Sequence, residues 1–135
     1  MLAVASDEPL FAVLDGHWGQ PRADVIADHI PADAWHRLSA GQGTKGPRWE
    51  DWARVRLARL RLSAQERRWD HGVLVRRRRS DPTDLAYSVV CAPAGTSLRT
   101  LVRGAGERWR MEQSCELAKG EVGLDEYEVR RWDGW

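Results

Sequence analysis

Two apolar runs separated by a strong turn signal place the main constraint on how this chain folds. The runs GVLV and LAYSVVCAP flank the segment RRRRSDPTD. Asp81-Pro82 favours a turn, because proline fixes its backbone angle and aspartate bonds to nearby backbone groups. Short apolar runs bounded by such turns are typical of β-strands. We therefore expect a β-hairpin over about residues 72–93, with a basic segment at its tip.

The basic segment contains four consecutive arginines, Arg76, Arg77, Arg78 and Arg79. Like charges this close repel one another unless counter-ions are present. A solvated tip satisfies this requirement with water and salt. A tip that faces phosphate groups satisfies it with a nucleic acid. The sequence leaves both interpretations open.

Other segments predict a mixed α and β chain. MLAVAS predicts a strand at residues 1–6, and WARVRLARL predicts a half-buried strand because Arg54 and Arg56 alternate with apolar residues. RADVIADHIP and PADAWHRLSA predict two short helices separated at Pro31. In the second helix, Ala34, Trp35 and Leu38 would share one face. SAQERRWD is expected to be a polar connector.

The segment SAGQGTKGPRW, residues 39–49, predicts a loop that contains Lys45 and Arg48. Its glycines would leave backbone amides exposed, so the loop could form an anion-binding nest. A plain turn is the alternative interpretation. The pattern does not match a P-loop, because the spacing of glycine, lysine and hydroxyl residues differs.

The longest predicted helix covers about residues 96–120. Thr96 or Ser97 is the expected N-cap and Gly120 the expected C-cap. Gly104 and Gly106 each weaken a helix interior by ~1 kcal/mol relative to alanine. Tertiary contacts are therefore expected to hold this helix, with close backbone packing at the glycines.

Three charged residues of this helix continue its apolar stripe. At helical spacing, Arg108, Glu112 and Lys119 fall in line with Leu98, Leu101 and Ala105. One interpretation is a simple ion pair between residues four apart, worth a few tenths of a kcal/mol. The other is a carboxylate held for a metal ion, with cations placed for a phosphodiester backbone.

Composition sets broad limits on the class of protein. The chain has 135 residues, 42% hydrophobic and 30% charged, which is typical of a single globular domain. The net charge of +1 excludes a strongly basic protein but permits local DNA-binding patches. Cys91 and Cys115 lie in apolar runs and are expected to be small core residues. No membrane span or signal peptide is predicted, so we expect a cytoplasmic protein.

RWRMEQSCELAK resembles the Y-x2-R-x3-E-x6-K signature of DDE-type insertion-sequence transposases. Arg108, Glu112 and Lys119 match it at the right spacing, and Trp109 also agrees. The flanking sequence from Arg76 to the end, and WHRLSAGQGTKGPRWEDWA upstream, is similar to the C-terminal part of one bacterial subgroup. The triplet alone is a weak signal, and the long flanking similarity strengthens it.

The resemblance implies an α+β fold, with a partial RNase H-like core, a β-rich insertion and a final helix that carries the catalytic glutamate. It implies metal-dependent cleavage and strand transfer at transposon ends, with Mg²⁺ as cofactor. Glu112 would be the third acidic metal ligand. Arg108 and Lys119 would contact DNA phosphates, and Trp109 would pack near the reactive DNA end. The basic hairpin, Arg76 to Arg79, and Lys45 and Arg48 would belong to the insertion and could touch DNA.

The sequence departs from the family pattern in two ways. Ala105 stands where the signature has tyrosine. The family's two catalytic aspartates would precede MLAVAS, and the family continues past WDGW. We therefore expect one partial catalytic domain: a strand and insertion over about residues 1–95, the glutamate helix over about 96–120, and a truncated tail over 121–135.

We expect such a chain to be inactive alone. If it acts with a partner protein, we expect that partner to be an intact transposase protomer. The alternative function is a non-catalytic DNA-binding remnant that regulates transposition. An unstable product without activity is the third possibility, since an incomplete sheet leaves unpaired edges.

Overall fold

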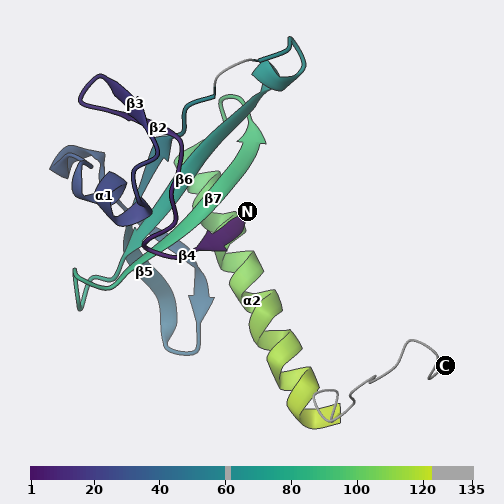
Figure 1. Ribbon diagram of the computed structural model, residues 1–135. Helices are drawn as coiled ribbons and strands as arrows, with labels where there is room; N and C mark the ends of the chain where they lie inside the picture. The colour runs from purple at the N-terminus through teal and green to yellow at the C-terminus, as the bar shows by residue number, and fades with distance from the viewer. Residues whose placement is uncertain (60–61, 123–135) are drawn as a thin grey trace, which may run out of the picture.

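A five-stranded antiparallel sheet forms the centre of the molecule in the computed structural model, which describes residues 1–59 and 62–122, with side chains up to residue 118 on the last helix. The strands are β1 (Leu2–Val4), β4 (His36–Gly43), β5 (Gly46–Arg56), β6 (Trp69–Arg77) and β7 (Leu85–Pro93). Their order across the sheet is β1-β7-β6-β5-β4, and every neighbouring pair is antiparallel (Figure 1).

One face of the sheet is covered by a small hairpin and a short helix. These elements are β2 (Ala12–Leu14), β3 (His17–Gly19) and α1 (Ala23–Asp28). Ile26 of α1 is buried against Val73 and Val75 of β6 and Tyr87 of β7. Side chains alternate between the two faces of a strand, so every second residue of β6 and β7 joins this core.

The other face is covered by the first half of α2 (Leu98–Val122). The Ser97 Oγ accepts a hydrogen bond from the Thr100 backbone nitrogen at 3.2 Å, which confirms Ser97 as the N-cap. Leu101 and Val102 are buried in a second core. The sheet supplies three further side chains to this core, Trp52, Leu74 and Val90.

The second half of α2 runs past the sheet and away from the body (Figure 1). Met111 and Leu117 are more than two-thirds exposed on this half, at 69% and 67%. The helix continues to Val122, so the predicted C-cap at Gly120 is wrong.

The predicted hairpin over residues 72–93 is confirmed as β6 and β7. The loop between them is held by the Asp81 carboxylate, which accepts a hydrogen bond from the Thr83 backbone nitrogen at 3.0 Å. Hydrogen bonds from the Thr83 hydroxyl and backbone lower the pKa of Asp81, and the charge of Arg78 lowers it further. The strand predicted at residues 1–6 is confirmed over Leu2–Val4 of β1. The strand predicted at residues 52–60 is confirmed up to Arg56, where β5 ends, and residue 60 lies outside the described residues. The first short helix is confirmed as α1.

The segment from residue 31 to residue 49 differs from the prediction. A single 3₁₀ turn, Ala32–Ala34, stands where a second helix was expected, and β4 begins at His36. Backbone pairing with β5 outweighs the helical spacing of Trp35 and Leu38. The expected loop at 39–49 is also wrong, because β4 and β5 pair directly up to Gly43 and Gly46.

Both cysteines are exposed, so the prediction that they fill the core is wrong. Cys91 lies near the end of β7 and Cys115 lies on the projecting half of α2. The polar connector at 63–70 contains a 3₁₀ turn, Glu66–Arg68, and then enters β6. Among the described residues, no helix is both long and apolar enough to cross a bilayer.

The buried tyrosine on β7 gives a test of this core at alkaline pH. Burial raises the pKa of Tyr87 above its ordinary value of 10.0, and the Asp24 and Asp28 carboxylates raise it further. Its contribution to stability is fully present below the unfolded pKa and is lost as pH rises through the raised folded pKa. We expect Tyr87→Phe to lose less unfolding free energy than wild type between about pH 9 and pH 11. Urea unfolding at both pH values measures this, and equal losses would contradict it.

Candidate functional site

A cleft of about 600 Å³ lies between the sheet and α2. Its floor comes from β4, β5, β6 and β7, and its wall comes from the middle of α2. Five arginines line it, from three elements and the loop after β6: Arg48, Arg76, Arg78, Arg108 and Arg110. Two tryptophans, Trp52 and Trp109, and two carboxylates, Glu50 and Glu112, complete the charged and aromatic lining. We call this site the arginine cleft.

A β-bulge positions the first of these arginines. Ser39 pairs with Trp49 and Gln42 pairs with Pro47, so Ala40 and Gly41 together lie opposite Arg48. Gly41 has a φ of +121°, a value that favours glycine. A bulge bends its strand and redirects the side chain opposite it. Arg48 lies opposite this bend and faces the cleft, as do Glu50 and Trp52 further along β5.

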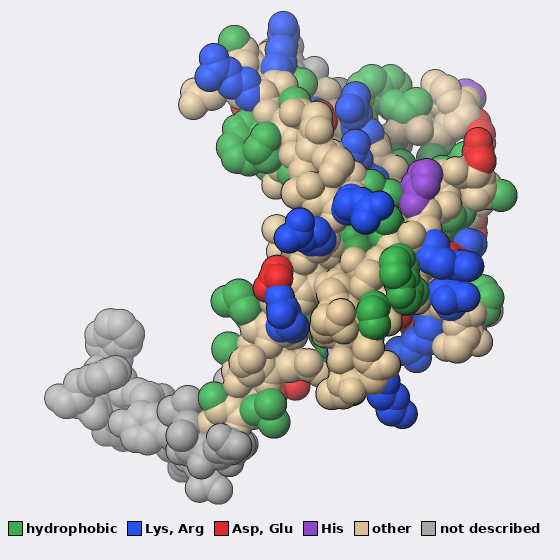
Figure 2. All heavy atoms as spheres, turned by 180° about the vertical axis from the view of Figure 1, so that it is seen from behind, with side chains coloured by type: hydrophobic (Ala, Val, Ile, Leu, Met, Phe, Trp, Pro, Cys, Tyr) green, Lys and Arg blue, Asp and Glu red, His purple; other side chains and the backbone are tan. Residues whose placement is uncertain are grey.

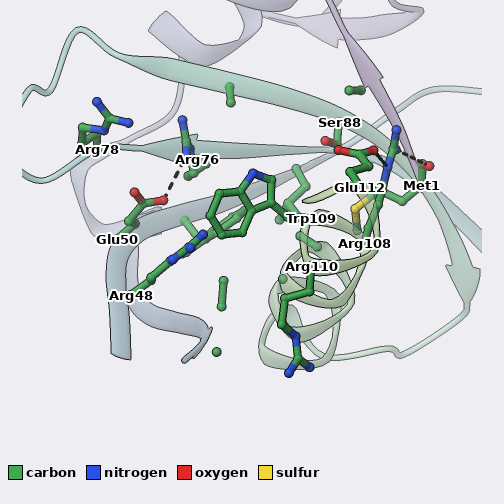
Figure 3. Close-up of a pocket in the computed structure, with 18 of the residues that line it drawn as sticks. Met1, Arg48, Glu50, Arg76, Arg78, Ser88, Arg108, Trp109, Arg110 and Glu112 are labelled. Atoms are coloured by element: carbon green, nitrogen blue, oxygen red, sulfur yellow. Dashed lines mark hydrogen bonds and ion pairs between the residues drawn. The ribbon is translucent and has the colours of Figure 1, made fainter. Parts of the chain in front are cut away.

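Arg48 stacks on the ring of Trp109. The guanidinium carbon lies 3.2 Å from the ring centroid, within the range of a cation–π interaction (Figure 3). Such a contact contributes about 0.5–1 kcal/mol when exposed. It also fixes a planar cation and an aromatic ring at the mouth of the cleft. Arg110 points away from this ring in Figure 3.

The bulge also controls how closely α2 approaches the sheet. A Cβ atom on Gly106 would lie 1.6 Å from the carbonyl oxygen of Ala40. This confirms the predicted close packing at Gly106. Gly104 has no atom within 4 Å of an added Cβ, so the same prediction is wrong there. Only a glycine allows the helix backbone to rest on the bulge at this point.

Three arginines of the four-arginine run, Arg76, Arg77 and Arg78, receive counter-ions from within the chain. Arg76 lies 3.4 Å from Glu50 and 3.6 Å from Asp84, and Arg78 lies 3.0 Å from Asp84. Arg76 belongs to β6 and Arg78 to the loop that follows (Figure 3). The sequence predicted that the whole basic segment lies at the hairpin tip. In the structure only part of it does, because Arg76 lies within β6. Folding brings carboxylates to two of its arginines on the cleft side.

Arg77 faces the opposite side of the sheet. It lies 3.5 Å from Asp51, and its guanidinium carbon lies 4.1 Å from the ring centroid of Trp35. Because side chains alternate along β6, the neighbouring residues Arg76 and Arg77 lie on opposite faces of the sheet. Arg79 lies in the exposed loop and does not line the cleft.

Arg108 and Glu112 form the ion pair expected at four-residue spacing. The Arg108 Nε lies 2.8 Å from a Glu112 oxygen, and Arg108 Nη1 donates to the Met1 carbonyl at 2.6 Å (Figure 3). The Glu112 side chain is 54% exposed, so the predicted extension of the buried stripe to Glu112 is wrong. The stripe ends near Ala105 because the sheet ends there. The side chain of Lys119 lies outside the described residues.

The described residues do not fit a Mg²⁺ site at Glu112. Mg²⁺ requires several oxygen ligands in near-octahedral geometry. Among the described side chains, those of residues 1–59 and 62–118, no group of three His, Cys, Asp or Glu is placed to hold a metal ion. Glu112 is instead engaged by Arg108.

Folding brings together six of the ten residues that the sequence singled out. These are Arg48, Arg76, Arg78, Arg108, Trp109 and Glu112. Lys45 lies in the turn between β4 and β5 and does not line the cleft. Sequence reasoning missed Glu50 and Trp52. Both alternate with Arg48 along β5, but the predicted loop at 39–49 included Arg48 and so separated it from the strand predicted to begin at Trp52.

Comparisons with known proteins give no relative: no family model matches the chain, and neither a curated protein nor a solved structure matches it.

Proposed function

We propose that this chain is a portion of an insertion-sequence transposase and that it contacts DNA through the arginine cleft. The antiparallel sheet from β4 to β7 would correspond to the family's β-rich insertion, and α2 to the helix that carries the glutamate. In this proposal, the RNase H-like core is the catalytic fold of the parent family. By itself, the chain is expected to bind DNA without cutting it.

One observation carries the proposal. The same cleft is lined by residues from three separate stretches of sequence, each predicted to contact DNA: those around Arg48, Arg76 and Arg108. Five arginines line the cleft, against four carboxylates that line it or pair with these arginines: Glu50, Asp84, Glu107 and Glu112. The remaining excess of positive charge attracts a phosphate backbone. Figure 2 shows, on the side opposite to Figure 1, that blue Lys and Arg side chains are more widespread than red acidic ones.

The alternative function is a non-catalytic regulator that occupies transposon ends. The pairing of Glu112 with Arg108 at 2.8 Å favours it, because the carboxylate is then used within the chain. Both functions require DNA binding, and they differ in whether an intact transposase protomer restores cleavage. Cytoplasmic location is part of either proposal.

A salt titration with labelled duplex DNA tests the binding. If three arginines of the cleft each neutralise a phosphate, the logarithm of the association constant should fall against log salt with a slope of about −2.7. Fluorescence anisotropy on the intact chain measures this slope. Absence of binding at low salt would reject both functions.

A second arm tests cleavage with Mg²⁺ and transposon-end DNA. We expect no product from wild type, and the same result from Glu112→Gln. A Mg²⁺-dependent product that is lost in Glu112→Gln would overturn the proposal that this chain does not cut DNA.

A further inference from the structure

A second hollow, of about 620 Å³, lies on the sheet face opposite the arginine cleft. Cys91 and His71 line it, and they are direct partners in the register of β7 and β6. Residues directly opposite on antiparallel strands project to the same side, with Cβ atoms about 4.5–5.5 Å apart. An exposed thiol and a half-buried imidazole are therefore neighbours in one hollow.

A fixed guanidinium stands beside this pair. Arg59 lines the hollow and donates hydrogen bonds to the backbone carbonyls of Glu66, at 3.2 Å, and of Trp69. These two bonds hold the side chain in place without neutralising its charge. The hollow also has an aromatic wall from Phe11 and Trp69.

Glu66 is the carboxylate that lines this hollow. Its oxygens accept a hydrogen bond from the Ser63 backbone nitrogen at 2.8 Å. Hydrogen bonds from the Ser63 backbone and hydroxyl lower the pKa of Glu66, and the charges of Arg59 and His71 lower it further. Glu66 is thus within electrostatic reach of the Arg59 guanidinium and the His71 ring, which share the hollow with Cys91.

We propose that Cys91 is a reactive thiol that forms a mixed disulfide with a small anionic disulfide. A thiolate is the nucleophile in such exchange, and adjacent His and Arg residues favour it. His71 supplies the neighbouring base. Arg59 supplies a positive charge for a carboxylate of the incoming molecule.

The exchange is balanced without any further reactant. The Cys91 thiol gives its proton to His71, and the thiolate attacks one sulfur of the small disulfide. A new S–S bond forms to Cys91, and the old S–S bond breaks. The released half leaves as a thiolate and takes the proton from His71. The Cys91 sulfur is oxidised and the released sulfur is reduced.

Cys115 is a matched control within the same chain. It is also exposed, but it lies on α2 beside Glu116 and three residues after Glu112. The described residues that line its hollow include no imidazole that could accept its proton. Cys91 has the His71 ring as its partner across the strand pair, where it can accept the thiol proton. We therefore expect Cys91 to react about fivefold faster than Cys115 near neutral pH.

Mass spectrometry of two intact proteins tests this, Cys115→Ser with only Cys91 left and Cys91→Ser with only Cys115 left. The probes are oxidised glutathione and the uncharged bis(2-hydroxyethyl) disulfide. His71→Gln in the Cys115→Ser protein should slow both probes about fivefold. Arg59→Gln should slow oxidised glutathione more than the uncharged probe.

Equal rates at Cys91 and Cys115 would overturn the proposal. So would an unchanged rate in His71→Gln. Should His71→Gln fail to fold, Arg59→Gln decides the matter through the ratio of its rates with the two probes. An unchanged ratio of the oxidised glutathione rate to the uncharged-probe rate would reject the role of the hollow.

Discussion

Gly106→Ala is expected to be the most destabilising small substitution in this chain. The added Cβ would lie 1.6 Å from the Ala40 carbonyl oxygen, and backbone cannot give way as a flexible side chain can. Helix α2 would have to lift from β4, which would expose Leu101 and Val102. We expect a loss of at least about 3 kcal/mol in unfolding free energy, or roughly 10 °C in melting temperature.

Gly104→Ala is the matched control for this prediction. It is the same substitution two residues earlier in the same helix, where nothing lies within 4 Å of the new atom. Alanine is the better helix former by ~1 kcal/mol, so this variant should melt at the same or a higher temperature. Circular dichroism melts of both variants give the comparison. Similar melting temperatures for the two would show that α2 does not rest on the bulge.

Reversing two charges of the arginine cleft is expected to produce the largest loss of DNA affinity. Arg48→Glu with Arg108→Glu removes one cation from each side of the cleft and places a carboxylate there. Each reversal is expected to weaken binding about tenfold, so the pair should weaken it about 100-fold. Fluorescence anisotropy at constant salt measures this change.

A double reversal elsewhere on α2 separates a local effect from a change in net charge. Arg99 and Arg103 are exposed and do not line the cleft. Arg99→Glu with Arg103→Glu changes the net charge by the same amount and should weaken DNA binding less than about threefold. An equal loss of DNA affinity in both double variants would mean that binding depends on the net charge of the protein and not on the cleft. Melting curves verify that each protein remains folded.

The fold was predictable where local signals and tertiary pairing agree. The β6–β7 hairpin follows from alternating apolar residues and the Asp81-Pro82 turn, and the start of α2 follows from the Ser97 cap. The segment from 31 to 49 was not predictable in this way. Its glycines suggested a loop, but the reversal takes place between Gly43 and Gly46, and Gly46 has a φ of +103°. The partner strand, and not local propensity, decides its structure.

The candidate site was predictable in its residues and not in its arrangement. The spacing of Arg108 and Glu112 on a helix predicted their ion pair, which is confirmed at 2.8 Å. The run of four arginines gave no indication of which members share a face with Arg48. That depends on the pleat of β6 and on carboxylates supplied by β5 and by the loop before β7. Such long-range partners cannot be read from spacing along the chain.

The bulge at Ala40 and Gly41 makes the arginine cleft depend on chain length as well as on side-chain chemistry. Two residues of β4 span the distance that Arg48 alone spans on β5. Shortening β4 by one residue would straighten the ladder and withdraw the support on which Gly106 rests. Every arginine would keep its identity, yet the sheet and the helix would no longer be in register. In a lineage of related chains, a one-residue deletion here would therefore be as consequential as the loss of a charge.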